Sequence, residues 1–114
     1  MNLSFLKDKT VLVTGGAGYI AAHLIPYLAG AAGRILRLDR PGAVLPPVVG
    51  PAAIEDIEAD IRERDLWNDL VQDADFIFHF AAQTSVYAAE EDPSADLCIN
   101  FLPVTNLLAA CRRQ

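Results

Sequence analysis

The glycine-rich stretch TVLVTGGAGYIAAHL, at residues 10–24, has the residue types and spacing to bind a phosphate group. It joins an apolar, β-branched run to a run with helical spacing. A turn of this kind leaves unpaired main-chain N–H groups and a partial positive charge at the helix N-terminus. Taken as G-x-G-x-x-G/A, the pattern matches Gly16, Gly18 and Ala21. We expect the first glycine to turn the chain, the second to admit a pyrophosphate, and Ala21 to set the packing of helix on strand.

An aspartate 21 residues after Gly18 adds a second group with nucleotide-binding chemistry. Asp39 ends the second apolar run, where a carboxylate would accept hydrogen bonds from the hydroxyls of an adenosine ribose. A tight turn without a ligand, with a helix-capping or surface aspartate, is the alternative. Arg40 could pair with a 2′-phosphate, but Asp39 would repel that group. The pair therefore favours NAD over NADP.

Alternating strands and helices are expected to position these residues. The order β-α-β-β-α-β-α is typical of an α/β fold in which helices cover both faces of a parallel sheet. We expect strands at 9–15, 34–39, 54–61 and 75–83, helices at 19–32, 64–72 and 93–113, and a Pro/Gly-rich surface loop after the second strand.

Four further details follow from residue types within these segments. Gly33 stands where the residue just beyond a helix C-terminus belongs, so it should end the first helix. The strand at 75–83 is apolar almost throughout, which predicts burial on both faces. Pro103 should bend the last helix, and the acidic residues 90–92 should cap it.

Composition and charge exclude several classes of function. The chain has 53% hydrophobic and 21% charged residues and a formal charge of −6, with no basic run longer than Arg112–Arg113, which argues against a nucleic-acid surface. We expect no apolar stretch of membrane-spanning length and no signal-peptide core. Cys98 and Cys111 should lie on one helix, roughly 20 Å apart, so they cannot form a disulfide and a cytoplasmic location fits best. The two histidines have no metal-ligand spacing.

Five motifs in register resemble the extended short-chain dehydrogenase/reductases, and specifically the NAD-dependent epimerase/dehydratase family that acts on nucleotide sugars. The motifs are TGGAGYIA, RLDR, ADIRE, DFIFHFAAQTSV and DPSADLCINFLPVTNLLAAC. Two positions depart from the family pattern: Ala21 replaces the last glycine of TGxxGxxG, and Pro103 stands where glycine is usual. The resemblance implies a Rossmann-type, doubly wound parallel sheet of about four strands in the order 3-2-1-4, incomplete relative to the family.

The resemblance also implies binding roles at the carboxyl ends of the strands. These are Gly15, Gly18, Tyr19 and Ile20 around the pyrophosphate, Asp39 at the adenosine ribose with Arg40 beside it, Asp60 and Ile61 at the adenine, Phe80, Ala81 and Ala82 along the cofactor, and Asn100 near the nicotinamide-side ribose. Gln83, Thr84 and Ser85 would begin a loop that faces the substrate. A polar loop that only caps the strand end is the alternative for these three residues.

The family's catalytic Tyr-x-x-x-Lys pair is absent from the 114 residues. None of the three tyrosines has lysine four positions later, because the only lysines are Lys7 and Lys9. The sequence therefore predicts that residues 1–114 are the N-terminal, NAD-binding part of a nucleotide-sugar epimerase or dehydratase, inactive on its own. A self-contained, non-catalytic NAD-binding module or subunit is the alternative.

The strand order 3-2-1-4 leaves the strand at 75–83 on one border of the sheet. Its FIFHF segment, from Phe76 to Phe80, contains no charge, proline or glycine that would resist pairing with another chain. The sequence therefore predicts self-association, either edge to edge through this strand or through the apolar surface beside it.

Overall fold

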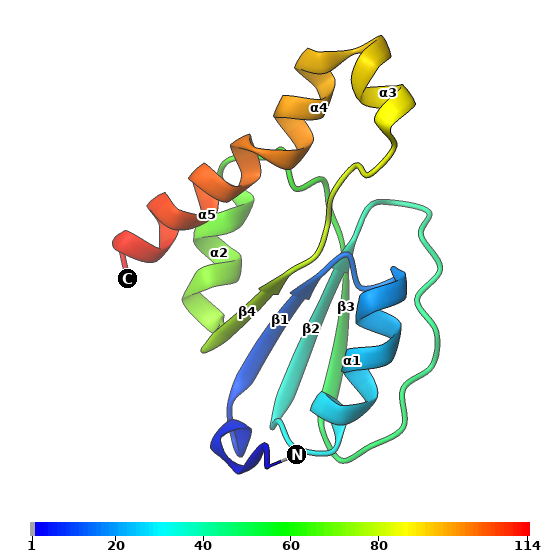
Figure 1. The fold of residues 1–114 in the computed structure, drawn as a ribbon. Coiled ribbons are helices and arrows are strands. Elements are labelled where there is room, and N and C mark those ends of the chain that lie inside the picture. Colours follow the sequence, from blue (N-terminus) through cyan, green and yellow to red (C-terminus); the bar gives the residue numbers. More distant parts are fainter. Residues whose placement is uncertain (1) are drawn as a thin grey trace.

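Four parallel strands form one sheet in the order β3-β2-β1-β4 (Figure 1). The computed structural model describes residues 2–114. Its elements are η1 (Ser4–Leu6), β1 (Thr10–Thr14), α1 (Tyr19–Ala29), β2 (Arg34–Asp39), β3 (Ala53–Glu58), α2 (Leu66–Asp73), β4 (Phe76–His79), α3 (Val86–Glu91), α4 (Pro93–Asn100) and α5 (Leu102–Arg112). The expected α/β fold and strand order 3-2-1-4 are confirmed.

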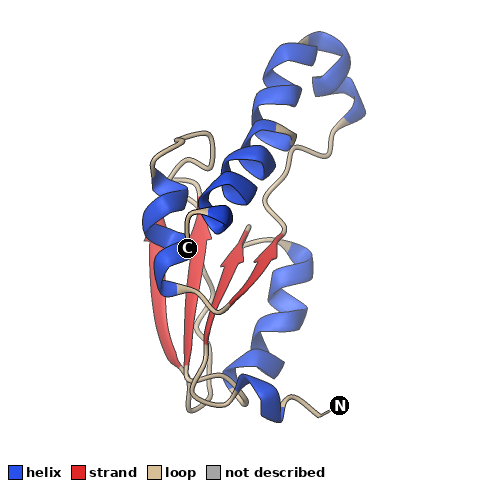
Figure 2. Cartoon of the chain, turned by 90° about the vertical axis from the view of Figure 1, so that its left-hand side faces the viewer, coloured by secondary structure: helices blue, strands red, loops and turns tan. Residues whose placement is uncertain are grey.

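Helices cover both faces of the sheet, as Figure 2 shows. On one face, α1 packs onto Val11 and Val13 of β1. On the other face, α2 and α5 pack around Leu12 through Trp67 and Ala110. Since successive side chains of a strand point to opposite faces, β1 contributes to both clusters and its three central residues are fully buried. This double cover explains the continuous apolar sequence of β1.

The first helix ends earlier than its sequence predicts. It stops at Ala29, and Gly30 follows as the C-cap in the right-handed helical conformation. The expectation that Gly33 ends the helix is wrong. Gly33 instead lies against the main chain before β1, where an added Cβ would stand 2.9 Å from Cα of Asp8. The glycine is required there by a close approach of two main-chain segments.

The third strand is also shorter than expected, since it ends at Glu58 and not at residue 61. A turn follows directly. The side chain of Asp60 accepts a hydrogen bond from the main-chain N–H of Arg62 at 2.9 Å, and its carbonyl accepts one from the N–H of Glu63 at 3.0 Å. Such an aspartate-stabilised turn takes the chain out of the sheet and leads it into α2.

The fourth strand lies at the edge of the sheet, and the expectation that it is buried on both faces is wrong. It spans only Phe76–His79 and pairs with β1 alone. Phe76 is 38% exposed and the other three residues are half-buried. Within the described residues no strand lies on the outer side of β4, which leaves its side chains partly exposed. The apolar sequence did not reveal this, because an unbroken apolar run can belong to a central strand or to an edge strand.

The expected long C-terminal helix is divided. Phe101 separates α4 from α5, because Pro103 has no main-chain N–H to donate to Ile99 four residues earlier. The bend at Pro103 is therefore confirmed. Asp92 caps α4 by accepting from the N–H of Ala95 at 3.0 Å, as the acidic run predicts. The short helix α3 before it, capped by Ser85, was not expected from the sequence.

Together α4 and α5 form a helical stretch that is long and apolar enough, by length and composition, to cross a membrane. The stretch 93–112 contains 20 residues; an 18-residue window within it has a mean hydropathy of 1.3, and 11% of that window is buried. The expectation that no apolar stretch reaches this length is wrong. In Figure 1, α4 extends beyond the sheet while α5 lies beside α2. Cys98 and Cys111 in this stretch are free thiols, as their spacing predicts.

Candidate functional site

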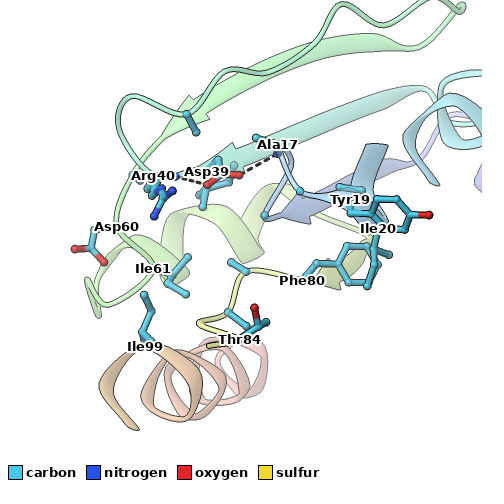
Figure 3. A pocket seen from close by; sticks show the side chains of 18 residues that line it. Ala17, Tyr19, Ile20, Asp39, Arg40, Asp60, Ile61, Phe80, Thr84 and Ile99 are labelled. Carbon is cyan, nitrogen blue, oxygen red and sulfur yellow. Dashed lines mark hydrogen bonds between the residues drawn. The ribbon is translucent and has the colours of Figure 1, made fainter. Parts of the chain in front are cut away.

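A cleft of about 500 Å³ opens at the carboxyl ends of all four strands (Figure 3). This is the size range of ligand-binding clefts. It collects residues from the loops that follow each strand, which is where open parallel sheets bind ligands. The lining residues are Gly15, Ala17, Gly18, Tyr19, Ile20, Ala21, Leu38, Asp39, Arg40, Ala43, Ala59, Asp60, Ile61, Phe80, Ala81, Ala82, Thr84 and Ile99.

The glycine turn after β1 forms the centre of the cleft wall. Gly15 has a φ of 67°, and a Cβ on it would stand 2.9 Å from the main-chain N of Ala81. Gly15, and not Gly16, is therefore the glycine that turns the chain, which corrects the first position of the expected pattern. Ala21 is 1% exposed in the cluster between α1 and β1, so its expected packing role is confirmed.

The N-terminus of α1 faces this cleft. Gly18 is the N-cap, and no side chain caps the helix. The N–H groups of Tyr19 and Ile20 therefore have no partner within the helix, and both residues line the cleft. This combination of unpaired N–H groups and the positive end of the helix dipole suits an anion such as a phosphate.

Asp39 connects the end of β2 to the glycine turn. Its Oδ2 accepts a hydrogen bond from the N–H of Ala17 at 2.9 Å, and its Oδ1 accepts one from the N–H of Arg40 at 2.7 Å (Figure 3). Each carboxylate oxygen can accept a further hydrogen bond. Asp39 therefore holds the turn in place and keeps acceptor capacity toward the cleft, which is what a pair of ribose hydroxyls requires.

Asp60 is oriented by an arginine that the sequence reasoning did not single out. Nε of Arg62 lies 2.9 Å from Oδ1 and 3.0 Å from Oδ2 of Asp60. Hydrogen bonds from the Arg62 side chain hold the pKa of Asp60 below its usual range. The spacing of an aspartate and an arginine two residues apart in ADIRE was the available signal. The carboxylate at the β3 end of the cleft is thus ionised and fixed in direction.

A buried threonine links β1 to the main chain that leaves β4. Oγ1 of Thr14 accepts hydrogen bonds from the N–H groups of Phe80 at 3.0 Å and Ala81 at 3.2 Å. The hydroxyl hydrogen is then available for Nδ1 of His79, which lies 2.7 Å away. His79 is therefore a neutral acceptor at Nδ1 with its proton on Nε2. Trp67 packs edge-on against its ring, with the centroids 5.5 Å apart, and burial lowers the pKa of His79.

This lowered pKa predicts that stability falls in mild acid. Below about pH 6.5 the unfolded chain binds a proton at His79 that the folded chain does not yet accept, so the free energy of unfolding decreases as the pH falls. Urea unfolding between pH 7.5 and 5.0 measures this change in the free energy of unfolding. We expect His79→Gln to flatten the pH dependence, since glutamine can still accept from Thr14. His23→Gln, on the exposed side of α1, is the matched control, and equal slopes in both variants would contradict the prediction.

The structure separates Thr84 from its two neighbours. Thr84 lines the cleft, whereas Gln83, Ser85 and Asn100 are not among the lining residues. Gln83 and Ser85 bond to each other, and the Asn100 side chain is bonded to the main chain of Gln83. All the other residues expected to bind a cofactor lie around the one cleft. In the part of the chain that the structure describes, no cluster of side chains could hold a metal ion.

Comparisons with known proteins show the family and the fold of this chain. Residues 11–114 match the family model described as the NAD dependent epimerase/dehydratase family. A putative UDP-glucose 4-epimerase of Methanocaldococcus jannaschii is 35% identical over 90% of this chain and 34% of its own length. The solved structure of epimerase Mth375 from Methanothermobacter thermautotrophicus superposes with a TM-score of 0.82 and 26% identity, over 97% of this chain and 34% of that one.

A second similar structure contains the nucleotide itself. The Bordetella bronchiseptica enzyme WbmF, solved in complex with NAD+, superposes with a TM-score of 0.78 and 26% identity, over 94% of this chain and 33% of that one. The chain therefore spans about a third of the length of these proteins.

Proposed function

Because the chain belongs to the NAD-dependent epimerase/dehydratase family, we propose that the cleft at the carboxyl edge of its sheet binds NAD. The observation that carries the proposal is the bond between the Asp39 carboxylate and the N–H of Ala17. This bond holds a carboxylate, which suits ribose hydroxyls, close to the unpaired N–H groups of α1, which suit a pyrophosphate. Repulsion between Asp39 and a 2′-phosphate favours NAD over NADP.

We infer the direction of the bound dinucleotide from the strand order. Across the edge β3-β2-β1-β4, the cleft presents Asp60, then Asp39, then the glycine turn, and then Phe80, Ala81, Ala82 and Thr84. A dinucleotide laid along this edge has its adenine near Asp60 and Ile61, its adenosine ribose at Asp39 and its pyrophosphate at Gly18. The nicotinamide half then lies along residues 80–84, where Ala81 and Ala82 leave room for a flat ring.

We extend the proposal to a larger protein, in which residues 1–114 form the NAD-binding part of a nucleotide-sugar epimerase or dehydratase. NAD bound there would supply a transient hydride acceptor for a sugar carbon. The 114 residues contain no Tyr-x-x-x-Lys pair, so no side chain is assigned the acid/base role. The same absence favours the second candidate, a non-catalytic NAD-binding module. Both candidates require the same cofactor cleft.

Calorimetric titration with NAD and NADP tests the shared proposal. We expect saturable binding of NAD and weaker binding of NADP, because only NADP carries a 2′-phosphate, which the Asp39 carboxylate would repel. The same preparation, incubated with NAD and a panel of UDP- and dTDP-sugars, should form no product. Heat changes no larger than those of buffer dilution would contradict the binding proposal, and product above a no-protein control would show that another residue acts as the base.

We also propose that the chain self-associates through the β4 edge. Within residues 2–114 no strand pairs with the outer side of β4, and the exposed ring of Phe76 on this strand packs edge-on against Phe5, with 5.6 Å between the ring centroids. An apolar strand with a free edge is a template for a second strand. Sedimentation over a concentration series should show a mass that rises with concentration. A constant mass near 12.3 kDa at high micromolar concentration would contradict this.

A reducing compartment remains our proposal for location, supported by the free thiols of Cys98 and Cys111. Cell fractionation tests it, with recovery in the cytoplasmic fraction as the expected result. Recovery with the membranes would contradict it and would indicate a role for the helical stretch 93–112.

A further inference from the structure

The side chain of Asn100, at the end of α4, is paired with the main chain of Gln83 beyond β4. Oδ1 of Asn100 accepts a hydrogen bond from the Gln83 N–H at 2.7 Å, and Nδ2 donates one to the Gln83 carbonyl at 2.8 Å. This two-bond contact resembles the pairing of a residue in a sheet, although residues 80–85 form no strand or helix. The carboxamide of Asn100 therefore serves to hold the loop.

Asp96, one helical turn before Asn100, completes this arrangement. Its Oδ1 accepts from Nδ2 of Asn100 at 3.1 Å and from Nε2 of Gln83 at 2.8 Å. The Gln83 carboxamide in turn donates to the carbonyl of Ser85 at 3.0 Å and accepts from the N–H of Ser85. We name these four residues, Gln83, Ser85, Asp96 and Asn100, the Gln83 clasp. Both hydrogens of each carboxamide nitrogen have an acceptor, so the N–H donors of the two carboxamides are saturated.

The Asp96 carboxylate is the common acceptor of the clasp. Within the described residues it forms no ion pair. Without it, one N–H of Asn100 and one N–H of Gln83 lose their partner in a half-buried place, which is costly. The two carboxamides would then be free to rotate, and the bonds of Gln83 to Ser85 and of Asn100 to Gln83 would no longer be enforced.

The clasp acts on the cleft through Thr84. Thr84 stands between two clasped residues, and it lines the cleft together with Ala82 just before the clasp and Ile99 just before Asn100 (Figure 3). Ala82 and Thr84 belong to the wall beyond β4, whereas Ile99 lies beside Ile61 (Figure 3). Loss of the clasp should therefore disturb the main chain that presents Thr84, while the carboxylates of Asp39 and Asp60, which are held by contacts outside the clasp, keep their places.

We propose that Asp96 is a positioning residue for the nicotinamide half of the NAD cleft. It holds the carboxamides of Gln83 and Asn100, which fix the main chain that presents Thr84 to the ligand. This assignment rests on the proposed NAD binding. Under this assignment the side chains of Asn100 and Gln83 hold the loop and do not contact the ligand. The position of Thr84 then depends on the Asp96 carboxylate, which also does not contact the ligand.

Two ligands and three variants test the proposal. NAD spans the whole cleft, whereas ADP reaches only the adenosine and pyrophosphate positions. We expect Asp96→Ala to weaken NAD binding about tenfold and to change ADP binding less than about twofold. Asp96→Asn keeps an Oδ1 that can accept both bonds, so it should recover most of the NAD affinity. Glu91→Ala, which removes an exposed carboxylate of α3, is the matched control and should behave as the unaltered chain.

Hydrogen exchange without ligand gives an independent reading. Asp96→Ala should speed exchange at the Gln83 and Ser85 N–H groups, and Asp96→Asn should keep them protected. Equal losses of NAD and ADP affinity, unchanged NAD affinity, or no rescue by asparagine would overturn the assignment. If the unaltered chain binds neither ligand, the NAD proposal fails, and unchanged exchange in Asp96→Ala would then overturn the clasp as well. If Asp96→Ala does not fold, Asp96→Asn is the deciding variant. Retained NAD affinity and retained protection of the Gln83 and Ser85 N–H groups would support the assignment, and loss of either would overturn it.

Discussion

Replacing Asp56 with alanine should lower the free energy of unfolding by about 3 kcal/mol. Asp56 on β3 accepts from Nε of Arg37 at 2.7 Å and from Nη2 at 2.9 Å, and the Arg37 side chain is only 4% exposed. The variant leaves a buried guanidinium with a single partner, the carbonyl of Pro46 at 2.6 Å. We expect a loss of free energy in the lower part of the range for broken buried ion pairs. The Asp56 side chain is 43% exposed, so water can supply part of the hydrogen bonding that Arg37 loses.

Urea unfolding followed by circular dichroism measures the loss, and the adjacent residue supplies a control. Glu55 on the same strand pairs with Arg34, but both side chains are exposed, at 52% and 41%. Glu55→Ala should therefore have a much smaller effect, since exposed ion pairs contribute little. Equal effects of the two substitutions would show that water compensates the Arg37 guanidinium fully. A second consequence of Asp56→Ala is a looser Pro/Gly-rich loop, because Arg37 also holds that loop at Pro46.

Replacing Asp39 with alanine should weaken NAD binding by about 1.5–3 kcal/mol, the range for hydrogen bonds to a charged group. This is roughly a tenfold to 150-fold loss of affinity. Two effects add: the ribose hydroxyls lose their acceptor, and the glycine turn loses the bond from Ala17. NADP should lose less or gain, because the negative charge that opposes its 2′-phosphate is gone while Arg40 remains beside the position.

Asp39→Asn separates the two effects. Asparagine retains an oxygen that can accept from Ala17, so it preserves the turn while it removes the charge. Calorimetry with NAD and NADP on both variants should rank NAD affinity as aspartate, then asparagine, then alanine. Unchanged NAD affinity in Asp39→Ala would refute the placement of the adenosine ribose at the end of β2.

Local pattern was sufficient to predict the elements that position the cleft. The β-branched run before Gly15 and the run from Arg34 to Asp39 are buried strands, since a parallel sheet covered on both faces requires continuous apolar sequence. The second strand has the expected bounds. Burial of β4 was not predictable in the same way, because its apolar sequence is the same whether or not a further strand lies beside it.

The supporting contacts of the cleft could not be predicted, because they depend on distances across the fold. The pairing of Arg37 with Asp56 follows from the register of β2 on β3, and no spacing rule gives that register. The Gln83 clasp depends on how α3 and α4 return the chain toward the end of β4. The spacing G-x-G-x-x-G/A begins at Gly16, whereas the φ of 67° and the close approach of Ala81 identify Gly15 as the turn glycine.

Amide chemical-shift mapping of the 15N-labelled chain during titration with NAD tests the central claim most directly. The account predicts saturable shifts at the carboxyl edge of the sheet, strongest at Gly18 and Tyr19 and extending to Ala81 and Thr84, with little change at Lys7 and Gly30 near the opposite edge. Absence of saturable shifts, or shifts concentrated around Lys7 and Gly30, would contradict the assignment of this cleft as an NAD site.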